Sequence, residues 1–275
     1  MYSYQNVQMK FRMGQVGLRH GGRFGTTLWA KFVTKQAILH SKLPDPPWLD
    51  PVRWRLPGVR PIEPDGWIIR DDVFTRQMAL RDDLIAERPR EVHALLPAAL
   101  PAAVECYDAM LVTLQKDSGY EFSTTEVARP DGITVALDRT QPLLTLGRLV
   151  QADICIMQEG DHGHVLTGAI LCFPAYWTLN EKLGRSLSQI HSPVAEYDSN
   201  IERRVQRLFD AMSPTRALLR SNANLHATAE LFAPKSETAA DARVGLQNGT
   251  FVRSERQVLR KLPDTKAIAF TIHTY

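Results

Sequence analysis

Histidines in the second half of the chain are the residues whose setting first suggests chemistry. His191 lies in the stretch TLNEKLGRSLSQIHSPV, residues 178–194, whose polar and apolar residues predict a short helix. Ser192-Pro193 disfavours helix beyond this point, because proline restricts the residue before it. We therefore expect the imidazole at a helix C-terminus, where a neutral ring nitrogen can bind a metal. A surface histidine that ends a helix fits the same pattern, so spacing alone leaves both alternatives open.

Other histidines offer weaker alternatives. His162 and His164 could supply two metal ligands, but they lie in a tight turn, where polar residues are usual. His226, in SNANLHATAELF, is close to apolar residues, a setting typical of a hydrogen-bonded structural histidine. His191 differs because a neutral imidazole is also the usual protein ligand of a haem iron.

A run of polar residues, RSERQ, interrupts what should be a packed strand near the C-terminus. Alternation places Arg253, Glu255 and Gln257 on one face of that strand and Ser254 and Arg256 on the other. A solvated sheet face is the interpretation that the pattern by itself favours. The alternative is a polar face lining a pocket, where arginine binds carboxylates or polarises a ligand.

Local patterns predict both helices and antiparallel strands around these residues. Capping boxes and helical spacing of apolar residues mark the helices, and paired β-rich runs around turn residues mark two hairpins. We expect helices over 71–88 and 92–119 and from Thr178 and Ser199, and hairpins of 148–157 with 164–173 and of 251–262 with 266–275. Hairpins imply an antiparallel sheet, so the prediction is α+β with flanking helices and an N-terminal helical segment.

Composition limits the class of function. The 275 residues carry a net charge of +3, too mild to argue for nucleic acid, and no apolar run is long enough to span a membrane. Three cysteines indicate a reducing compartment, for which we expect the cytoplasm. Three thiols cannot supply the four ligands of an iron–sulfur cluster. The sequence also contains no P-loop, nucleophile elbow or HExxH motif.

The chain divides into a basic extension and a single domain. Residues 1–44 contain no acidic residue, and we expect a loosely attached, disordered extension, with a mitochondrial transit peptide as the alternative. The predicted domain covers residues 45–275.

Several stretches together resemble the haem-dependent oxidative N-demethylase family. They are LGRLVQADICIM (146–157), HVLTGAILCFPAYWTLNEKLGRSLSQIHSPV (164–194), RSN (220–222), LFAP (231–234) and VRSERQVLRKLPDTKAIAFTIHTY (252–275), joined by ALRDDLIAERPREVHALLP (79–97). The resemblance covers roughly residues 60–275, and the basic extension lies outside it.

The resemblance implies a haem-binding PAS-like domain with an oxidative activity. Relatives remove a methyl group from a small secondary amine such as dimethylamine, consuming O2 and NADPH and giving formaldehyde. Reductase subunits supply the electrons through FMN and a 2Fe–2S cluster, which agrees with the few cysteines here, and tetrahydrofolate takes part in the wider complex. The rival class is a PAS-like haem or small-molecule sensor without turnover, because a fold does not fix a function.

Carried over to this sequence, the resemblance gives His191 first place as the iron ligand. His226 is second and His164 third. It also implies pocket roles for several polar residues, namely Arg220, Asn222, Arg253, Glu255 and Arg256. Arginines there would pair with haem propionates or polarise a bound ligand. Glu255 would bind the ammonium group of the amine, and Asn222 would add a polar contact.

Two residues depart from the family pattern. Relatives tend to carry a tryptophan and then a serine after the asparagine, where this chain has Ala223 and Asn224. Because loss of an indole beside a pocket opens a large volume, we expect a change in substrate, with a bulkier amine as one alternative.

Overall fold

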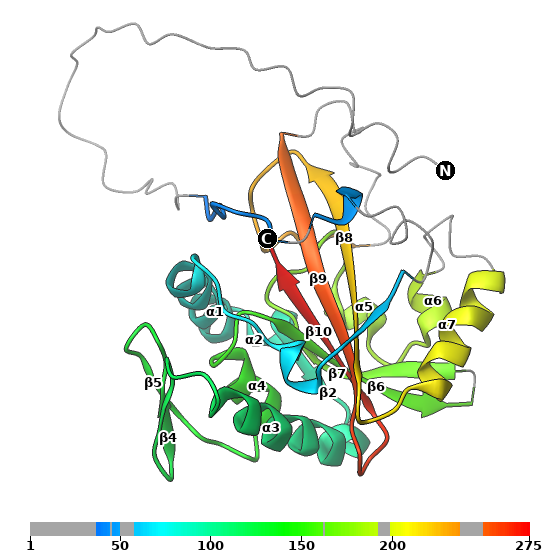
Figure 1. Ribbon diagram of the computed structural model, residues 1–275, viewed down its shortest axis with the longest axis horizontal. Helices are drawn as coiled ribbons and strands as arrows, with labels where there is room; N and C mark the ends of the chain where they lie inside the picture. The colour runs from blue at the N-terminus through cyan, green and yellow to red at the C-terminus, as the bar shows by residue number, and fades with distance from the viewer. Residues whose placement is uncertain (1–36, 45, 50–57, 162, 192–198, 237–249) are drawn as a thin grey trace, which may run out of the picture. The chain divides into compact units, whose positions relative to one another are not determined.

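The computed structural model describes residues 37–44, 46–49, 58–161, 163–191, 199–236 and 250–275 (Figure 1). The chain divides into two units at Ala37, and the described residues belong almost entirely to the second unit, Ile38–Tyr275. Most of the predicted basic extension over 1–44 therefore lies outside the described residues, and its boundary with a domain over 45–275 stays a prediction.

An antiparallel sheet of seven strands organises the second unit, in the order β1-β8-β9-β10-β6-β7-β2. Every neighbouring pair is antiparallel, which confirms the predicted α+β class. Its strands are β1 (Arg60–Ile62), β2 (His93–Leu95), β6 (Asp153–Gly160), β7 (Gly163–Ile170), β8 (Ala217–His226), β9 (Phe251–Lys261) and β10 (Ile268–Thr274). A separate small sheet consists of β3 (Glu121–Phe122), β4 (Glu126–Ala128) and β5 (Thr134–Ala136).

Both predicted hairpins are confirmed, as β6–β7 and β9–β10. Strand β8, in contrast, has no counterpart among the predicted elements. It pairs with β9 along its whole length, from Ala217 opposite Arg260 to His226 opposite Phe251. Its sequence, ALLRSNANLH, ends in polar residues that have low intrinsic strand preference. Pairing with β9 outweighs that preference.

Helices cover the sheet, as predicted, although one predicted helix is wrong at its start. Residue 92 ends a short helix and residues 93–95 form strand β2, which pairs with β7. The helix predicted over 92–119 is therefore confirmed only for Leu100–Leu114, which form α3. The α-helices are α1 (Phe74–Glu87), α2 (Pro89–Val92), α3 (Leu100–Leu114), α4 (Pro142–Gly147), α5 (Leu179–Lys182), α6 (Leu187–His191) and α7 (Ser199–Ala211), with 3-10 turns at Pro47–Leu49, Pro64–Trp67 and Pro97–Ala99. Among the described helices, none combines the length and apolar character needed to cross a bilayer.

Each face of the sheet packs against its own set of helices (Figure 1). The α1–α4 core contains Ile154 of β6 and Val258 of β9, together with residues of α1, α3 and α4. The α5–α7 core contains the neighbours Cys155 and Leu259, together with residues of α5 and α7. Successive residues of one strand therefore point into different cores. Along β8 and β9, every second side chain faces α1–α4 and the others face α5–α7.

Candidate functional site

Strands β8 and β9 bring most of the predicted site residues onto one face of the sheet. Leu218 and Leu259 are paired across the two strands, and both pack in the α5–α7 core. Antiparallel partners share a face and side chains alternate along each strand. The polar residues that follow on this face are therefore the cross-strand pairs Arg220–Gln257, Asn222–Glu255 and Asn224–Arg253. Beyond them, His226 is paired with Phe251.

Glu255 is the centre of a hydrogen-bond network on this face. Its Oε2 accepts bonds from Asn222 Nδ2 at 3.2 Å and Gln257 Nε2 at 2.9 Å. Arg253 Nε lies 3.6 Å from Glu255 Oε1, an ion pair that is longer than a hydrogen bond. Asn222 Oδ1 is buried and has no hydrogen-bond partner among the described residues. A buried acceptor without a donor is costly, so this network has an unfilled position for a donor.

Arg253 is held rigidly by backbone oxygens. Its Nη1 donates to Leu231 O at 2.9 Å and its Nη2 donates to Phe173 O. Burial lowers the pKa of Arg253, although the negative charge of Glu255 acts in the opposite sense. Arg253 therefore holds a positive charge beside Glu255. Its two hydrogen bonds also connect β9 to the loops that contain Phe173 and Leu231.

His226 lies at the far end of the same strand pair, beside a cavity. Its ring stacks on Tyr176, with centroids 4.6 Å apart and an angle of 16° between the planes. Burial and the nearby charge of Arg253 lower the pKa of His226, which favours the neutral ring. Stacking and burial are what a structural histidine requires, as the sequence pattern indicated.

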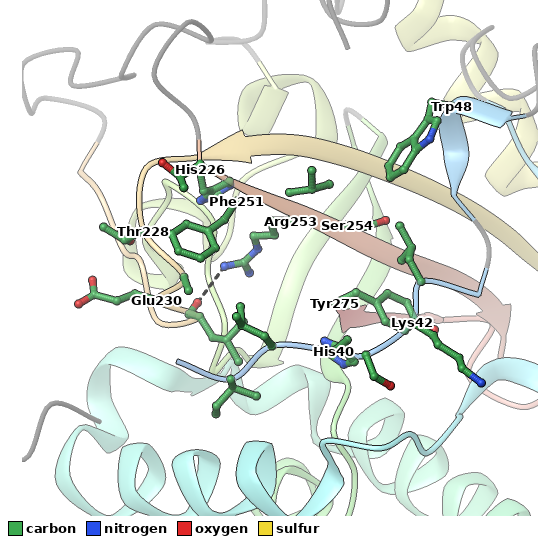
Figure 2. Close-up of a pocket in the computed structure, with 18 residues that line it drawn as sticks. His40, Lys42, Trp48, His226, Thr228, Glu230, Phe251, Arg253, Ser254 and Tyr275 are labelled. Carbon is green, nitrogen blue, oxygen red and sulfur yellow. Dashed lines mark hydrogen bonds between the residues drawn. The ribbon is translucent and has the colours of Figure 1, made fainter. Parts of the chain in front are cut away.

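The cavity has a volume of about 400 Å³ and lies between the ends of β8 and β9 and a distant chain segment. Figure 2 shows His226, Phe251 and Arg253 on one side, and His40 and Tyr275 on the other. Segment 38–43 and the turn containing Trp48 complete the wall. Local sequence patterns did not identify segment 38–43 or Tyr275 as part of a site, because no local pattern connects residue 40 with residue 275.

His191 lies at the C-terminal end of α6, as predicted. Its Nδ1 is 2.8 Å from Leu187 O, and since a carbonyl only accepts, Nδ1 must carry the proton. In the neutral ring the lone pair is then on Nε2. Burial lowers the pKa of His191, and the charges of Arg220 and Lys182 lower it further, against the bond to Leu187, which raises it. His191 is therefore a neutral imidazole of fixed tautomer, close enough to Arg220 for electrostatic interaction.

Two predicted residues lie apart from this group. Arg256 lies on the opposite face of β9, where its Nη2 donates to Gly66 O at 2.6 Å. His164 is buried between β7 and α7, with its ring 4.9 Å from that of Phe209 and its Nδ1 3.2 Å from Gln206 Nε2. Its predicted companion, His162, lies outside the described residues.

The remaining residues have the chemistry that an iron porphyrin requires. His191 offers a neutral nitrogen whose other ring nitrogen is oriented by a carbonyl, the usual arrangement for a metal-binding histidine. Leu187 and Ile190, from the same helix, pack on the α5–α7 core and supply an apolar wall. Arg220 supplies a cation suited to a carboxylate, and the buried acceptor of Asn222, which has no described partner, follows it on the same face of β8. This donor set fits haem.

Fold and site define an α+β protein in which a helix-end imidazole and a polar strand pair share one face of an antiparallel sheet. The chain belongs to the family described as haem-dependent oxidative N-demethylase, alpha subunit-like, whose sequence model matches residues 58–275. This match confirms the family resemblance found in the sequence. Comparison with curated proteins gives no match. The family description associates its members with haem, with oxidative demethylation and with a complex of several subunits.

Proposed function

We propose that this chain binds haem and demethylates a small alkylamine, similar to dimethylamine, with O2 and with electrons from a separate NADPH-dependent reductase. The family match supports the class of reaction. The single observation that carries the proposal is His191, a part-buried imidazole at the end of α6 whose Nδ1 is bonded to Leu187 O at 2.8 Å. When bound, haem would supply the oxidative chemistry, and the protein would supply the ligand, the polarity and the access.

The strand order supports a PAS-like arrangement of the domain. Strands β7, β6, β10, β9 and β8 are neighbours in that order, and helices α5–α7 lie in sequence between β7 and β8. In a PAS-like sheet, we infer, a hairpin is followed by helices and then by three further strands that pair beside the hairpin. The order found here has this arrangement. In this proposal the haem is bound on the side of the sheet that faces α5–α7.

Each polar residue of the site has a distinct proposed role. His191 Nε2 would bind the iron, and Arg220 would pair with a carboxylate of the porphyrin. Glu255 binds the ammonium group of the substrate, because a carboxylate keeps acceptor sites beyond those that Asn222 and Gln257 fill. Asn222 Oδ1 accepts a further N–H from the same amine. Arg253 holds Glu255 in place, and Arg256 is left out because it lies on the other face.

The partner cofactors, FMN, NADPH and a 2Fe–2S cluster, would be bound by other subunits. The three cysteines of this chain are all unpaired and buried. Burial raises the pKa of Cys106 and Cys172 to about 12 and also raises that of Cys155. Metal clusters bind thiolates rather than thiols, so these cysteines do not suit a cluster. Unpaired cysteines also support the proposed cytoplasmic location.

The experiment that tests the proposal is turnover of dimethylamine. Protein purified with haem is supplied with NADPH, a reductase and dimethylamine, and formaldehyde is measured. Formaldehyde in proportion to amine consumed supports the enzyme. Tight O2 or NO binding without amine consumption would support the alternative, a PAS-like sensor. A preparation without haem, from cells given ample iron and haem precursor, would contradict the enzyme and the haem sensor and would favour the small-molecule sensor.

A further inference from the structure

Three side chains from distant parts of the chain converge on the α1–α4 side of the sheet. His40 precedes the turn at Trp48, Asp71 lies just before α1, and His273 is on β10. His40 Nε2 is 2.8 Å from Asp71 Oδ2, and His273 Nε2 is 2.7 Å from the same oxygen. The three candidate ligand atoms lie within 4.8 Å of one another. Two imidazole nitrogens and one carboxylate oxygen therefore surround a single point.

Asp71 is oriented by partners on its other oxygen. Its Oδ1 accepts bonds from Gln151 Nε2 at 2.8 Å and from the backbone N–H of Val73 at 3.1 Å. Gln151 in turn accepts a bond from Asp71 N at 3.1 Å. Oriented carboxylate ligands of this kind are typical of metal sites, where outer hydrogen bonds fix the ligand that touches the ion.

The two histidines can present lone pairs at the same point. The side chains of His40, Asp71 and His273 are 6 %, 14 % and 3 % exposed, so water is largely excluded. Without a metal, both Nε2–H groups donate to Asp71 Oδ2. His273 Nδ1 has no hydrogen-bond partner among the described residues, so no described donor opposes a move of its proton to Nδ1. Moving each ring proton from Nε2 to Nδ1 frees both Nε2 lone pairs with no net release of protons. Arg256, across from His273 on β9, is a cation on this face whose charge opposes binding.

We propose that His40, Asp71 and His273 form a binding site for one divalent transition-metal ion, separate from the haem site. Two imidazoles and a carboxylate that leave other positions open are a ligand set of zinc and of non-haem iron. His40 also lines the cavity in Figure 2, so the site adjoins a space from which further ligands can enter. Bound metal would fasten segment 38–43, which forms part of that cavity's wall, to α1 and β10.

Zinc binding to the full chain without a histidine tag tests the site. The haem-loaded protein is treated with a chelator and titrated with Zn²⁺ by calorimetry, and zinc is measured by elemental analysis, which separates it from haem iron. We expect about one Zn²⁺ per chain. His40→Gln keeps a donor for Asp71 but removes a ligand, and it should weaken Zn²⁺ binding more than about 100-fold. Gln151→Ala, which removes an outer partner, should weaken it about 10- to 100-fold.

His93→Ala is the matched control, because His93 is half-buried on β2 and lies outside the cluster. It should leave Zn²⁺ binding unchanged. The proposal is overturned if the wild-type chain retains no zinc, or if His40→Gln and His93→Ala bind it equally well. The cluster would then be a hydrogen-bonded network only. The Soret band of His40→Gln should equal that of the wild type, so failure of this site is distinguishable from failure of the haem proposal.

Discussion

Two carboxylates on the same sheet, the buried Asp153 and the part-buried Glu255, have different kinds of partners. Asp153 accepts bonds from the backbone N–H groups of Cys172 and Phe173, at 2.7 and 2.9 Å, and from Arg81 Nη1 at 2.6 Å. Arg81 also donates to two backbone oxygens, and both side chains of this pair have zero exposure.

Glu255, in contrast, has side-chain partners and a looser ion pair. Two amide groups donate to it, Arg253 is 3.6 Å away, and Asn222 Oδ1 beside it has no described partner. Backbone donors fix a charge permanently, whereas amide side chains can rearrange around a ligand. The difference indicates that Asp153 holds the fold together and that Glu255 is suited to binding.

The largest expected effect is on stability, from loss of the Asp153 carboxylate. Asp153→Ala leaves Arg81 buried without its partner, and we expect the free energy of unfolding to fall by about 3–5 kcal/mol. Asp108→Ala removes a surface pair with Arg139, and the two side chains are 49 % and 64 % exposed. Its loss should therefore be much smaller, because solvent screens an exposed pair. Urea unfolding of both variants measures the difference. Equal losses would show that Asp153 has no special structural role.

The next effect concerns haem and the helix-end imidazole. His191→Ala should abolish the Soret band or convert it to that of a weakly ligated haem, because the chain loses its proposed bond to iron. The absorption spectrum of the purified protein measures this, with His93→Ala as the histidine control. A spectrum unchanged from that of the wild type would transfer the ligand role to His226 or His164.

Replacement of the binding carboxylate should separate substrate from cofactor. Glu255→Gln keeps an acceptor for Asn222 and Gln257 but removes the charge that we propose binds the ammonium group. We expect amine affinity to fall by about 10-fold or more, the value of one charge-assisted hydrogen bond, with little change in haem affinity. Spectral titration with dimethylamine measures the first and haem titration the second. If Glu255→Gln weakens amine binding and haem binding equally, Glu255 is structural. Glu121→Gln, which removes an exposed carboxylate on β3, is the control and should change neither affinity.

The smallest expected effect is a dependence of stability on pH. Burial holds the pKa of His191 and His226 below the ordinary histidine value of 6.5. Both rings are therefore neutral in the fold and become protonated first in the unfolded chain. Their contribution is fully present above pH 6.5 and is lost as pH falls through the lower folded-state pKa. Urea midpoints at about pH 7.5 and about pH 5.5 measure the loss of stability. The difference between the two midpoints should be smaller in His226→Gln and in His191→Gln than in the wild type. An equal difference would show that these histidines do not cause the pH dependence.

Local pattern was enough to predict the hairpins, the helix at 74–87 and the helix end at His191. These elements depend on period, on turn residues and on proline, all of which act between near neighbours. The pattern was insufficient at β2 and β8, because the polar residues of 217–226 form a strand only when β9 supplies hydrogen-bond partners along its length. Residues 93–95 likewise form a strand only beside β7.

The sequence by itself determined the family, the α+β class and the alternation that separates Arg253 and Glu255 from Arg256. Tertiary structure alone decided what each face meets. It placed Asn222 opposite Glu255, put Arg256 against Gly66, and joined His40, Asp71 and His273. The physical reason is that periodicity fixes the direction of a side chain relative to its own strand, whereas a contact such as that of Asp71 with His273, 202 residues apart, depends on how the whole chain packs.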